Sequence, residues 1–241
     1  MTADSPEALI QVRGLVKTYG LLPVLRGLEL DIARGESVSL LGSNGSGKST
    51  FLRLVSALSK PTSGRITVGG WELPREAAAV RAQIGMVAHK PLLYENLTAQ
   101  ENLHFFARLY HVPNLEARTS ELLDRVGLAK RANDLVRTFS RGMLQRMAIA
   151  RALIHEPEVL LFDEPHTGLD QDAAAMLDAV VLEQRANGRT VVMATHELER
   201  AARLSSRIII LARGAISADT PSDGMTGAEL AALYAAKAGA R

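Results

Sequence analysis

Short apolar runs alternate with turn residues over the first third of the chain. Apolar positions in residues 8–32 are interrupted by glycines and by Pro23, a pattern typical of antiparallel strands joined by turns. Residues 37–41 form a short apolar run typical of a buried strand, and a glycine-rich turn follows at once. From residue 49 to about residue 58 the apolar positions recur at helical spacing. The pattern therefore predicts antiparallel strands and then a strand–turn–helix unit.

Helical periodicity dominates the middle of the chain. Thr98 and Glu101 have the spacing of a capping box in which Thr98 is the N-cap of a helix. A second helix is predicted over about residues 117–126, and a third begins after Ser140 and runs to about residue 155. We therefore expect residues 89–155 to form a helical subdomain inserted into the rest of the chain.

Strand and helix alternate from residue 156 onward, which is typical of a parallel sheet with crossover helices. The expected fold class is α/β, one domain over residues 1–241 with a mostly parallel sheet core. Residues 8–88 and 156–215 are expected to form this core together with an N-terminal antiparallel β subdomain, and residues 216–241 a C-terminal tail. The predicted elements are strands at 159–162, 191–194 and 208–211, and helices at 170–186, 197–204 and 227–239.

Composition narrows the class of protein. The 241 residues, 47% of them hydrophobic, suffice for one large domain, and a charged fraction of 22% is not that of a disordered chain. The 28 basic residues nearly balance the 26 acidic ones, so we expect no nucleic-acid partner. The chain has no cysteine, which excludes a disulfide scaffold, a Cys-ligated metal and a thiol nucleophile.

Targeting signals and membrane-spanning runs are not predicted. The chain does not open with a charged segment followed by an apolar core, as a secretory signal does. No apolar run approaches the roughly 20 residues that span a bilayer. We therefore expect a cytoplasmic protein that acts on a membrane only through a partner.

Residues 42–49 (GSNGSGKS) match the phosphate-binding pattern G-x-x-x-x-G-K-[ST] between a predicted strand and a predicted helix. Glycines let the backbone curl so that N–H groups point at phosphate oxygens, and the helix N-terminus adds a favourable dipole. Lys48 can reach the β- and γ-phosphates, and the Ser49 hydroxyl is placed to bind Mg²⁺. The motif predicts a nucleoside triphosphate site. Its residues are Gly42, Ser43, Asn44, Gly45, Ser46, Gly47, Lys48, Ser49 and Thr50.

Two acidic residues end the first apolar strand after residue 156. Ligand sites of parallel sheets lie at the C-terminal edge of the strands, so Asp163 and Glu164 are expected beside the phosphate loop. Asp163 can bind Mg²⁺, and Glu164 can orient or deprotonate the attacking water. His196 follows the next strand in the same way and is expected near the γ-phosphate. The candidate catalytic residues are therefore Lys48, Glu164 and His196.

The segment FSRGMLQR, residues 139–146, precedes the acidic strand. Ser140 is a good N-cap, and the helix that it begins has its positive end at that serine. Such a helix start can bind phosphate, but the chain already has a loop for that purpose. A second anion site indicates a composite site built with another subunit.

Taken together, these motifs resemble those of the ATP-binding subunit of an ABC transporter, over about residues 9–215. The resemblance implies a P-loop NTPase (RecA-like) core that hydrolyses ATP with Mg²⁺. It also implies two ATP molecules sandwiched between two subunits, so a homodimer is expected. Separately encoded transmembrane permease subunits would then hold the dimer peripherally on the inner face of the cell membrane.

The resemblance also assigns roles to single residues. Tyr19 stands where an aromatic residue commonly stacks on adenine, and Asp170 lies in the segment that resembles the family's D-loop. His89 stands where the family usually has the glutamine that senses Mg²⁺ and γ-phosphate, and Arg141 replaces the first glycine of the signature segment. The signature residues expected to reach the ATP bound to the other subunit are Ser140, Arg141, Gly142, Met143 and Gln145.

Residues 88–97 (AHKPLLYENL) place an apolar cluster in a predicted loop. An apolar cluster on a wet surface favours a groove for a membrane subunit, although ordinary packing under the helical subdomain gives the same pattern. The sequence predicts that this segment receives the permease.

Short stretches such as residues 42–45 and 101–106 look most similar to the haem exporter ATP-binding subunit of cytochrome c biogenesis, so haem export is the finer expectation. The alternatives are an exporter of drugs, antibiotics or lipids, and a soluble ABC ATPase of iron–sulfur cluster assembly. DNA-repair relatives are disfavoured because only about 115 residues separate Lys48 from Asp163 and zinc modules would need cysteine. An adenylate-type kinase leaves the 139–146 segment and His196 unexplained.

Overall fold

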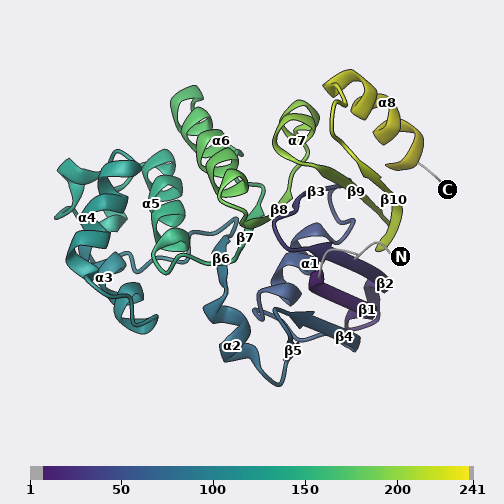
Figure 1. Cartoon of the computed structure of the whole chain (residues 1–241), viewed down its shortest axis with the longest axis horizontal. Helices are drawn as coiled ribbons and strands as arrows, with labels where there is room; N and C mark the ends of the chain where they lie inside the picture. The colour runs from purple at the N-terminus through teal and green to yellow at the C-terminus, as the bar shows by residue number, and fades with distance from the viewer. Residues whose placement is uncertain (1–7, 239–241) are drawn as a thin grey trace, which may run out of the picture.

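In the computed structural model, which describes residues 8–238, a six-stranded sheet runs through the middle of the molecule (Figure 1). The strand order is β10-β9-β3-β8-β7-β6, and all neighbours pair in parallel except β9 and β10. The mostly parallel core predicted from the alternation of elements is confirmed. The strands are β3 (Ser37–Leu41), β6 (Ile84–Val87), β7 (Val159–Asp163), β8 (Thr190–Ala194), β9 (Arg207–Ala212) and β10 (Ala215–Pro221).

A second, antiparallel sheet has the strand order β2-β1-β4-β5. Its buried side chains form one hydrophobic cluster with those of β3 and of the helix that follows it, so the two sheets share a core. The antiparallel strands predicted over residues 8–32 are confirmed. Two further strands were not predicted, although buried Ile66 and Val68 alternate with less buried positions. The four strands are β1 (Ala8–Tyr19), β2 (Leu22–Ala33), β4 (Ser63–Val68) and β5 (Trp71–Leu73).

Three α-helices form a lobe on the side of the molecule away from the antiparallel sheet (Figure 1). The predicted capping box is present, because Thr98 Oγ1 accepts from the Glu101 N–H and the Glu101 carboxylate accepts from the Thr98 N–H. Buried side chains of the lobe form one cluster with those of β7, β8 and α6, so the lobe is packed on the core. The helices are α3 (Ala99–Leu109), α4 (Leu115–Arg125) and α5 (Arg141–Leu153), with two short 3₁₀ helices at Ala129–Arg131 and Val136–Thr138.

The remaining helices pack on the two sheets or on one another. Strand β10 has no counterpart in the sequence prediction: residues assigned to the C-terminal tail extend the core sheet by pairing with β9. The final helix packs on α7, with Leu230 fully buried between them. No helix within residues 8–238 is long and apolar enough to cross a bilayer. The helices are α1 (Lys48–Val55), α2 (Ala77–Ala82), α6 (Gln171–Ala186), α7 (Leu198–Leu204) and α8 (Gly227–Ala238).

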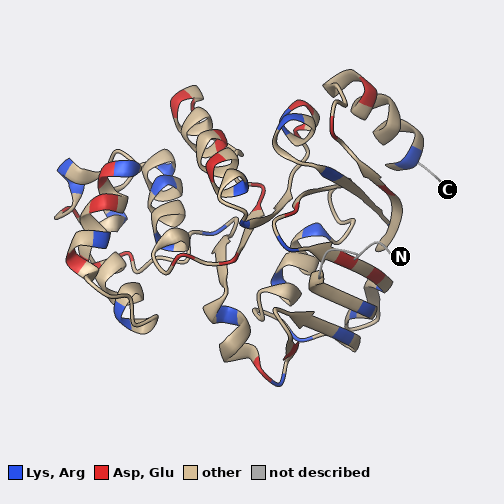
Figure 2. Cartoon of the chain, viewed as in Figure 1, with Lys and Arg blue, Asp and Glu red and all other residues tan. Residues whose placement is uncertain are grey.

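The carboxyl ends of β3, β7 and β8 meet at one edge of the core sheet. Gly42 follows β3, Asp163 ends β7 opposite Ala194 of β8, and His196 comes two residues after β8. Helices α1, α2 and α5 carry basic residues only, whereas the other α-helices carry residues of both signs (Figure 2). Because these three strand ends meet, the topology of the sheet brings together Gly42, Asp163 and His196.

Candidate nucleotide-binding site

The loop between β3 and α1 curls tightly around its own backbone. Gly42 has φ +155°, and a Cβ there would lie 2.4 Å from Ser46 Oγ and 2.5 Å from the Leu211 carbonyl oxygen. Gly47, the N-cap of α1, has φ +110°, and a Cβ there would lie 2.5 Å from a methyl carbon of Leu25. Side chains would therefore strain the loop at both positions, and glycine is required for its curled shape.

The concave side of this loop lines a cavity of about 470 Å³. The hydroxyl of Ser46 is buried and has no hydrogen-bond partner among the described residues. An unsatisfied buried hydroxyl is costly, so the loop offers a donor to a ligand oxygen. The cavity is lined by Leu22, Val24, Ser43, Asn44, Gly45, Ser46, Gly47, Lys48, Ser49, Thr50 and Glu164.

Lys48 folds back across the loop that it belongs to. Its Nζ donates to the Gly42 carbonyl oxygen at 2.7 Å and lies 3.6 Å from Glu164 Oε1. The side chain is only 6% exposed. A buried ammonium group therefore stands between the loop and the acid at the end of β7, where a phosphate group could compete for it.

Ser49 and Asp163 form an oxygen pair beside Lys48. The Ser49 hydroxyl donates to Asp163 Oδ1 at 2.7 Å. Burial raises the pKa of Asp163 above its usual range, and the Ser49 hydrogen bond opposes this change, as do the charges of His89 and Lys48. A desolvated carboxylate next to a hydroxyl is a donor set that suits Mg²⁺, so these residues fit the ion that the sequence predicts.

Glu164 and His196 are in contact although they follow different strands. His196 Nδ1 lies 2.7 Å from Glu164 Oε2, and the Glu164 N–H donates to the carbonyl oxygen of Ala194 at 2.9 Å. Glu164 has φ +51°, in the left-handed region that a residue with a side chain rarely adopts. The carboxylate of Glu164 is therefore held between the His196 imidazole and the Lys48 ammonium group. A carboxylate in this place is close enough to the phosphate loop to accept a proton from a water molecule there.

His89 lies in the loop after β6 and faces the same acids. It lines a small cavity of about 100 Å³ together with Asp163 and Glu164. Arg141 lines that cavity as well, and its guanidinium lies against Gly168, where a Cβ would come within 2.5 Å of it. Both positions at which the sequence departs from the family pattern therefore lie beside Asp163 and Glu164 of their own chain.

The 139–146 segment does not line the phosphate-loop cavity of the same chain and contacts the loop after Glu164 instead. Ser140 is the exposed N-cap of α5, and its Oγ accepts from the Met143 N–H at 3.3 Å. The side-chain amide of Gln145 donates to the Pro165 carbonyl oxygen at 2.9 Å. A Cβ on Gly142 would lie 4.0 Å from Oδ2 of Asp170, which caps α6. The helix start that was expected to bind a second phosphate is open to an outside partner.

Tyr19 lies at the tip of the β1–β2 hairpin and is 48% exposed. The Lys17 ammonium stands 4.8 Å from the centre of its ring. The lining of the phosphate-loop cavity includes Leu22 and Val24 of the same hairpin. The side chain is thus partly open to solvent, and its stacking on adenine stays a prediction.

Sequence reasoning missed a buried ionic cluster next to the site. His166 lies two residues after Glu164, and its Nε2 is 2.7 Å from Oδ1 of Asp178 on α6. His166 opens the segment that resembles the D-loop, but a histidine alone in a loop carries no signal of a buried partner. The available clue was the position of His166 in the short segment between Glu164 and Asp170.

Comparison with known proteins agrees with this geometry. The family profile described as ABC transporter matches residues 25–167. The linearmycin resistance ATP-binding protein LnrL of Bacillus subtilis (strain 168) is 39% identical over 208 residues, which cover 86% of this chain and 67% of that protein. The daunorubicin resistance ATP-binding protein DrrA3 of Streptomyces coeruleorubidus is 41% identical over 219 residues, which cover 90% of this chain and 69% of that protein.

Solved structures are similar as well. An ATP-binding cassette solved as a dimer in a post-hydrolysis state, bound to ADP and Pi, superposes with a TM-score of 0.83 at 30% identity. The match covers 88% of this chain and 98% of the other. The expectation of haem export finds no support in these relatives, because the two curated proteins are named for resistance to antibiotics.

Proposed function

This chain belongs to the ABC transporter family as an ATP-binding and ATP-hydrolysing subunit, and from that premise we propose that it powers the export of antibiotic or drug molecules. The observation that carries the catalytic part is the convergence of Lys48, Glu164 and His196 at the edge of the core sheet. The resistance functions in the names of LnrL and DrrA3 support export of such a cargo.

In this proposal ATP lies in the phosphate-loop cavity. Backbone N–H groups of residues 43–49 and the Ser46 hydroxyl bind phosphate oxygens. Lys48 gives up its contacts with Gly42 and Glu164 for the β- and γ-phosphates. Ser49 and Asp163 would hold Mg²⁺, which would supply positive charge to neutralise the phosphate oxygens.

Glu164 acts on the water that attacks the γ-phosphate. With Lys48 drawn to the phosphates, its carboxylate is free to accept a proton from that water. His196 holds the carboxylate through the 2.7 Å contact and borders the γ-phosphate, while His89 shares a small cavity with Asp163 and Glu164. The strained backbone at Glu164 fixes the direction of the base before ATP arrives.

The site is completed by a second copy of the chain. Ser140 and Gly142 lie at the open N-terminus of α5, where the positive end of the helix can meet the γ-phosphate of ATP bound to the partner subunit. The dimeric ATP-binding cassette among the similar structures supports this arrangement. ATP then holds the two subunits together, and hydrolysis lets them part.

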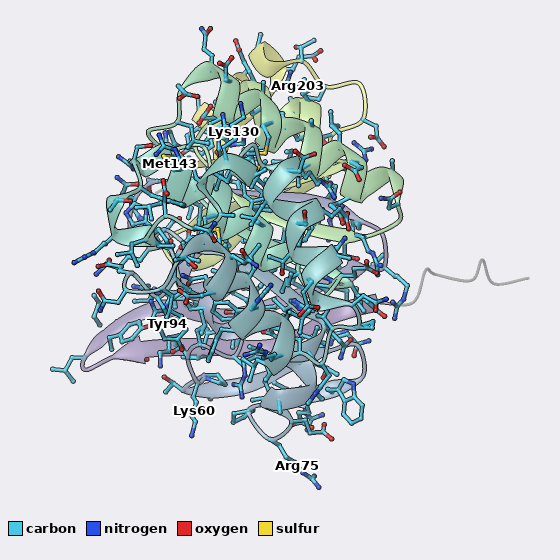
Figure 3. All side chains as sticks on the ribbon, turned by 90° about the vertical axis from the view of Figure 1, so that its left-hand side faces the viewer. Lys60, Arg75, Tyr94, Lys130, Met143 and Arg203 are labelled. Carbon is cyan, nitrogen blue, oxygen red and sulfur yellow. The ribbon has the colours of Figure 1, made fainter. Side chains whose placement is uncertain are left out.

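An apolar patch on the helical lobe supports docking to a permease. Leu92, Tyr94, Phe105 and Leu109 are all exposed, and Tyr94 and Phe105 meet edge to face with ring centres 4.8 Å apart. Tyr94 lies on the face of the lobe that Figure 3 turns toward the viewer. An aromatic surface of this kind suits an inserted helix of a membrane subunit, which would place the chain on the inner face of the membrane.

The test is a resistance assay in a sensitive host. The chain is expressed with the permease of its own gene cluster, and growth is measured against linearmycin and daunorubicin. Wild type should raise the inhibitory concentration, and Lys48→Ala should not. Equal resistance with both variants contradicts an ATP-driven exporter. Membrane fractionation with and without the permease separates a transporter subunit from a soluble ATPase of iron–sulfur cluster assembly. The transporter subunit should move to the membrane fraction when the permease is present, whereas the soluble ATPase should not.

A further inference from the structure

The loop of residues 164–170, which follows the proposed catalytic base, is tied to α6 by a buried histidine. The His166 side chain is 1% exposed, and its Nε2 lies 2.7 Å from Oδ1 of Asp178. Burial lowers the pKa of His166 in spite of the adjacent carboxylate, so the ring is neutral near pH 7. An ionised carboxylate only accepts, which makes the Nε2–H the donor to Asp178.

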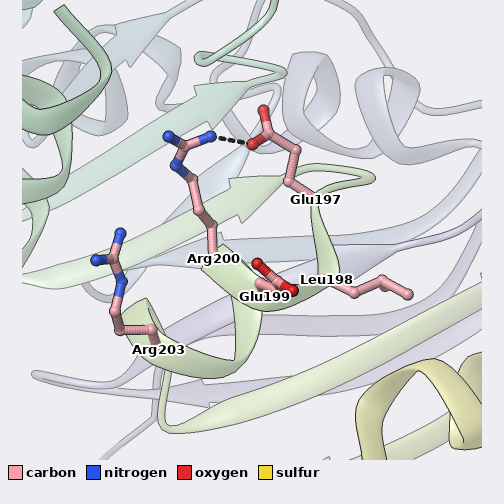
Figure 4. Close-up of a pocket in the computed structure, with 5 residues that line it drawn as sticks. All are labelled: Glu197, Leu198, Glu199, Arg200 and Arg203. Carbon is pink, nitrogen blue, oxygen red and sulfur yellow. Dashed lines mark hydrogen bonds and ion pairs between the residues drawn. The ribbon is translucent and has the colours of Figure 1, made fainter. Parts of the chain in front are cut away.

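Two arginines of α7 bind the other oxygen of Asp178. Arg200 Nε donates to Oδ2 at 3.4 Å, and the Arg203 guanidinium donates to the same atom. Arg200 also pairs with Glu197, the N-cap of α7 (Figure 4). A hollow of about 540 Å³ opens beside these α7 side chains. We call His166, Asp178, Arg200 and Arg203 the Asp178 cluster.

The Asp178 cluster is adjacent in sequence to both members of the proposed catalytic pair. His166 lies two residues after Glu164, and α7 begins two residues after His196. The pair meets at 2.7 Å across the ends of β7 and β8. A bond from the 164–170 loop through Asp178 to α7 therefore braces the two segments that carry the pair.

We propose that His166 is a positioning residue for ATP hydrolysis, because its bond to Asp178 holds the 164–170 loop against α6, which is bonded in turn to α7, and so keeps Glu164 and His196 in contact. The inference rests on the hydrolysis site described under the proposed function. The competing explanation is that His166 fills space between the loop and α6. The two explanations predict different turnover rates for a variant that loses the bond to Asp178 but keeps a polar side chain at position 166.

A matched pair of substitutions separates these explanations. In His166→Gln the side-chain amide N–H can reach the place of the ring Nε2, whereas the side chain of His166→Asn is one bond shorter and cannot reach Asp178. We expect His166→Asn to lower kcat by about tenfold, with the KM for ATP within about twofold of wild type, since small displacements of catalytic groups cost rate rather than substrate affinity. His166→Gln should restore kcat to within about threefold of wild type.

The control is Arg185→Gln, which removes an exposed α6 pairing with Asp223 outside the Asp178 cluster and should leave kcat unchanged. Turnover is normalised to the measured number of ATP-binding sites, so misfolded protein does not count. Wild-type kcat in His166→Asn overturns the proposal, as does an equal loss in His166→Asn and His166→Gln.

A double variant tests the route of the effect. Because His166 acts through the Glu164–His196 contact, adding His166→Asn to His196→Ala should cause no further loss of kcat. A further loss of about tenfold would mean that His166 acts elsewhere, and would overturn the proposal. ATP turnover is independent of the cargo, so a failed resistance assay with an intact His166 effect rejects only the export proposal.

Discussion

Replacing Glu164 by glutamine removes the proposed base and keeps its shape. Glu164 Oε2 contacts His196 Nδ1 at 2.7 Å, and Oε1 lies 3.6 Å from Lys48 Nζ. Glutamine still hydrogen-bonds to the imidazole but accepts no proton from water. Loss of a general base slows turnover roughly 10²–10⁴-fold, which raises the activation free energy by about 3–5 kcal/mol. The phosphate loop is untouched, and Lys48 loses a competing carboxylate, so ATP affinity should not fall.

Single-turnover hydrolysis and ATP binding should be measured on the same preparation of Glu164→Gln. The expected combination is slow cleavage with wild-type or tighter binding, and a shift from monomer to dimer in size-exclusion chromatography when ATP is added. Glu72→Gln, which alters an exposed carboxylate paired with Arg65, is the control and should behave as wild type. Turnover near the wild-type rate in Glu164→Gln would refute the assignment of the base.

Three further outcomes are expected. Lys48→Ala should abolish tight ATP binding in calorimetry, because it removes the cation of the phosphate loop; unchanged affinity would remove the loop assignment. Tyr94→Ala combined with Phe105→Ala should leave basal ATP turnover intact but abolish its stimulation by the permease, and retained stimulation would exclude the aromatic patch as the docking surface. Burial lowers the pKa of His155 from 6.5 to about 4, below its unfolded value, so the free energy of unfolding should fall by about 3 kcal/mol as pH drops through that window. His155→Phe keeps the stack on Tyr110 and should remove most of this difference in the free energy of unfolding, as measured by urea titrations at pH 7 and pH 4. An unchanged difference between the two pH values would show that His155 is not its source.

Strong local signals explain why most elements agree with the sequence. The run at residues 37–41 coincides with β3, since a short apolar segment before a glycine turn has few other uses. Asp170 and Ser140 cap α6 and α5 because their side-chain oxygens satisfy free N–H groups at the helix starts. Such signals act within a few residues, so the sequence alone contains them.

Elements that depend on distant partners were not predicted. Strand β10 is an edge strand with no fully buried position, in which Ser217, Asp219 and Thr220 interrupt the apolar residues, and pairing with β9 defines it. Strands β4 and β5 are likewise recognisable only through their pairing with β1 and with each other. In β4 only Ile66 and Val68 mark the buried face, and β5 has three residues, so neither strand is long enough to show a clear hydrophobic period of its own.

The motifs by themselves determined the chemistry: a phosphate loop ending in Lys48 and Ser49, acids at the end of a buried strand, and a histidine at the end of the next. Their residue types are set by what phosphate and Mg²⁺ require. Tertiary structure decided which of them touch. The 2.7 Å contact of Glu164 with His196 and the bond of His166 to Asp178 join residues 32 and 12 positions apart. Parallel pairing of β7 and β8 and the packing of α6 and α7 create these contacts, and no local pattern in the chain encodes such distances.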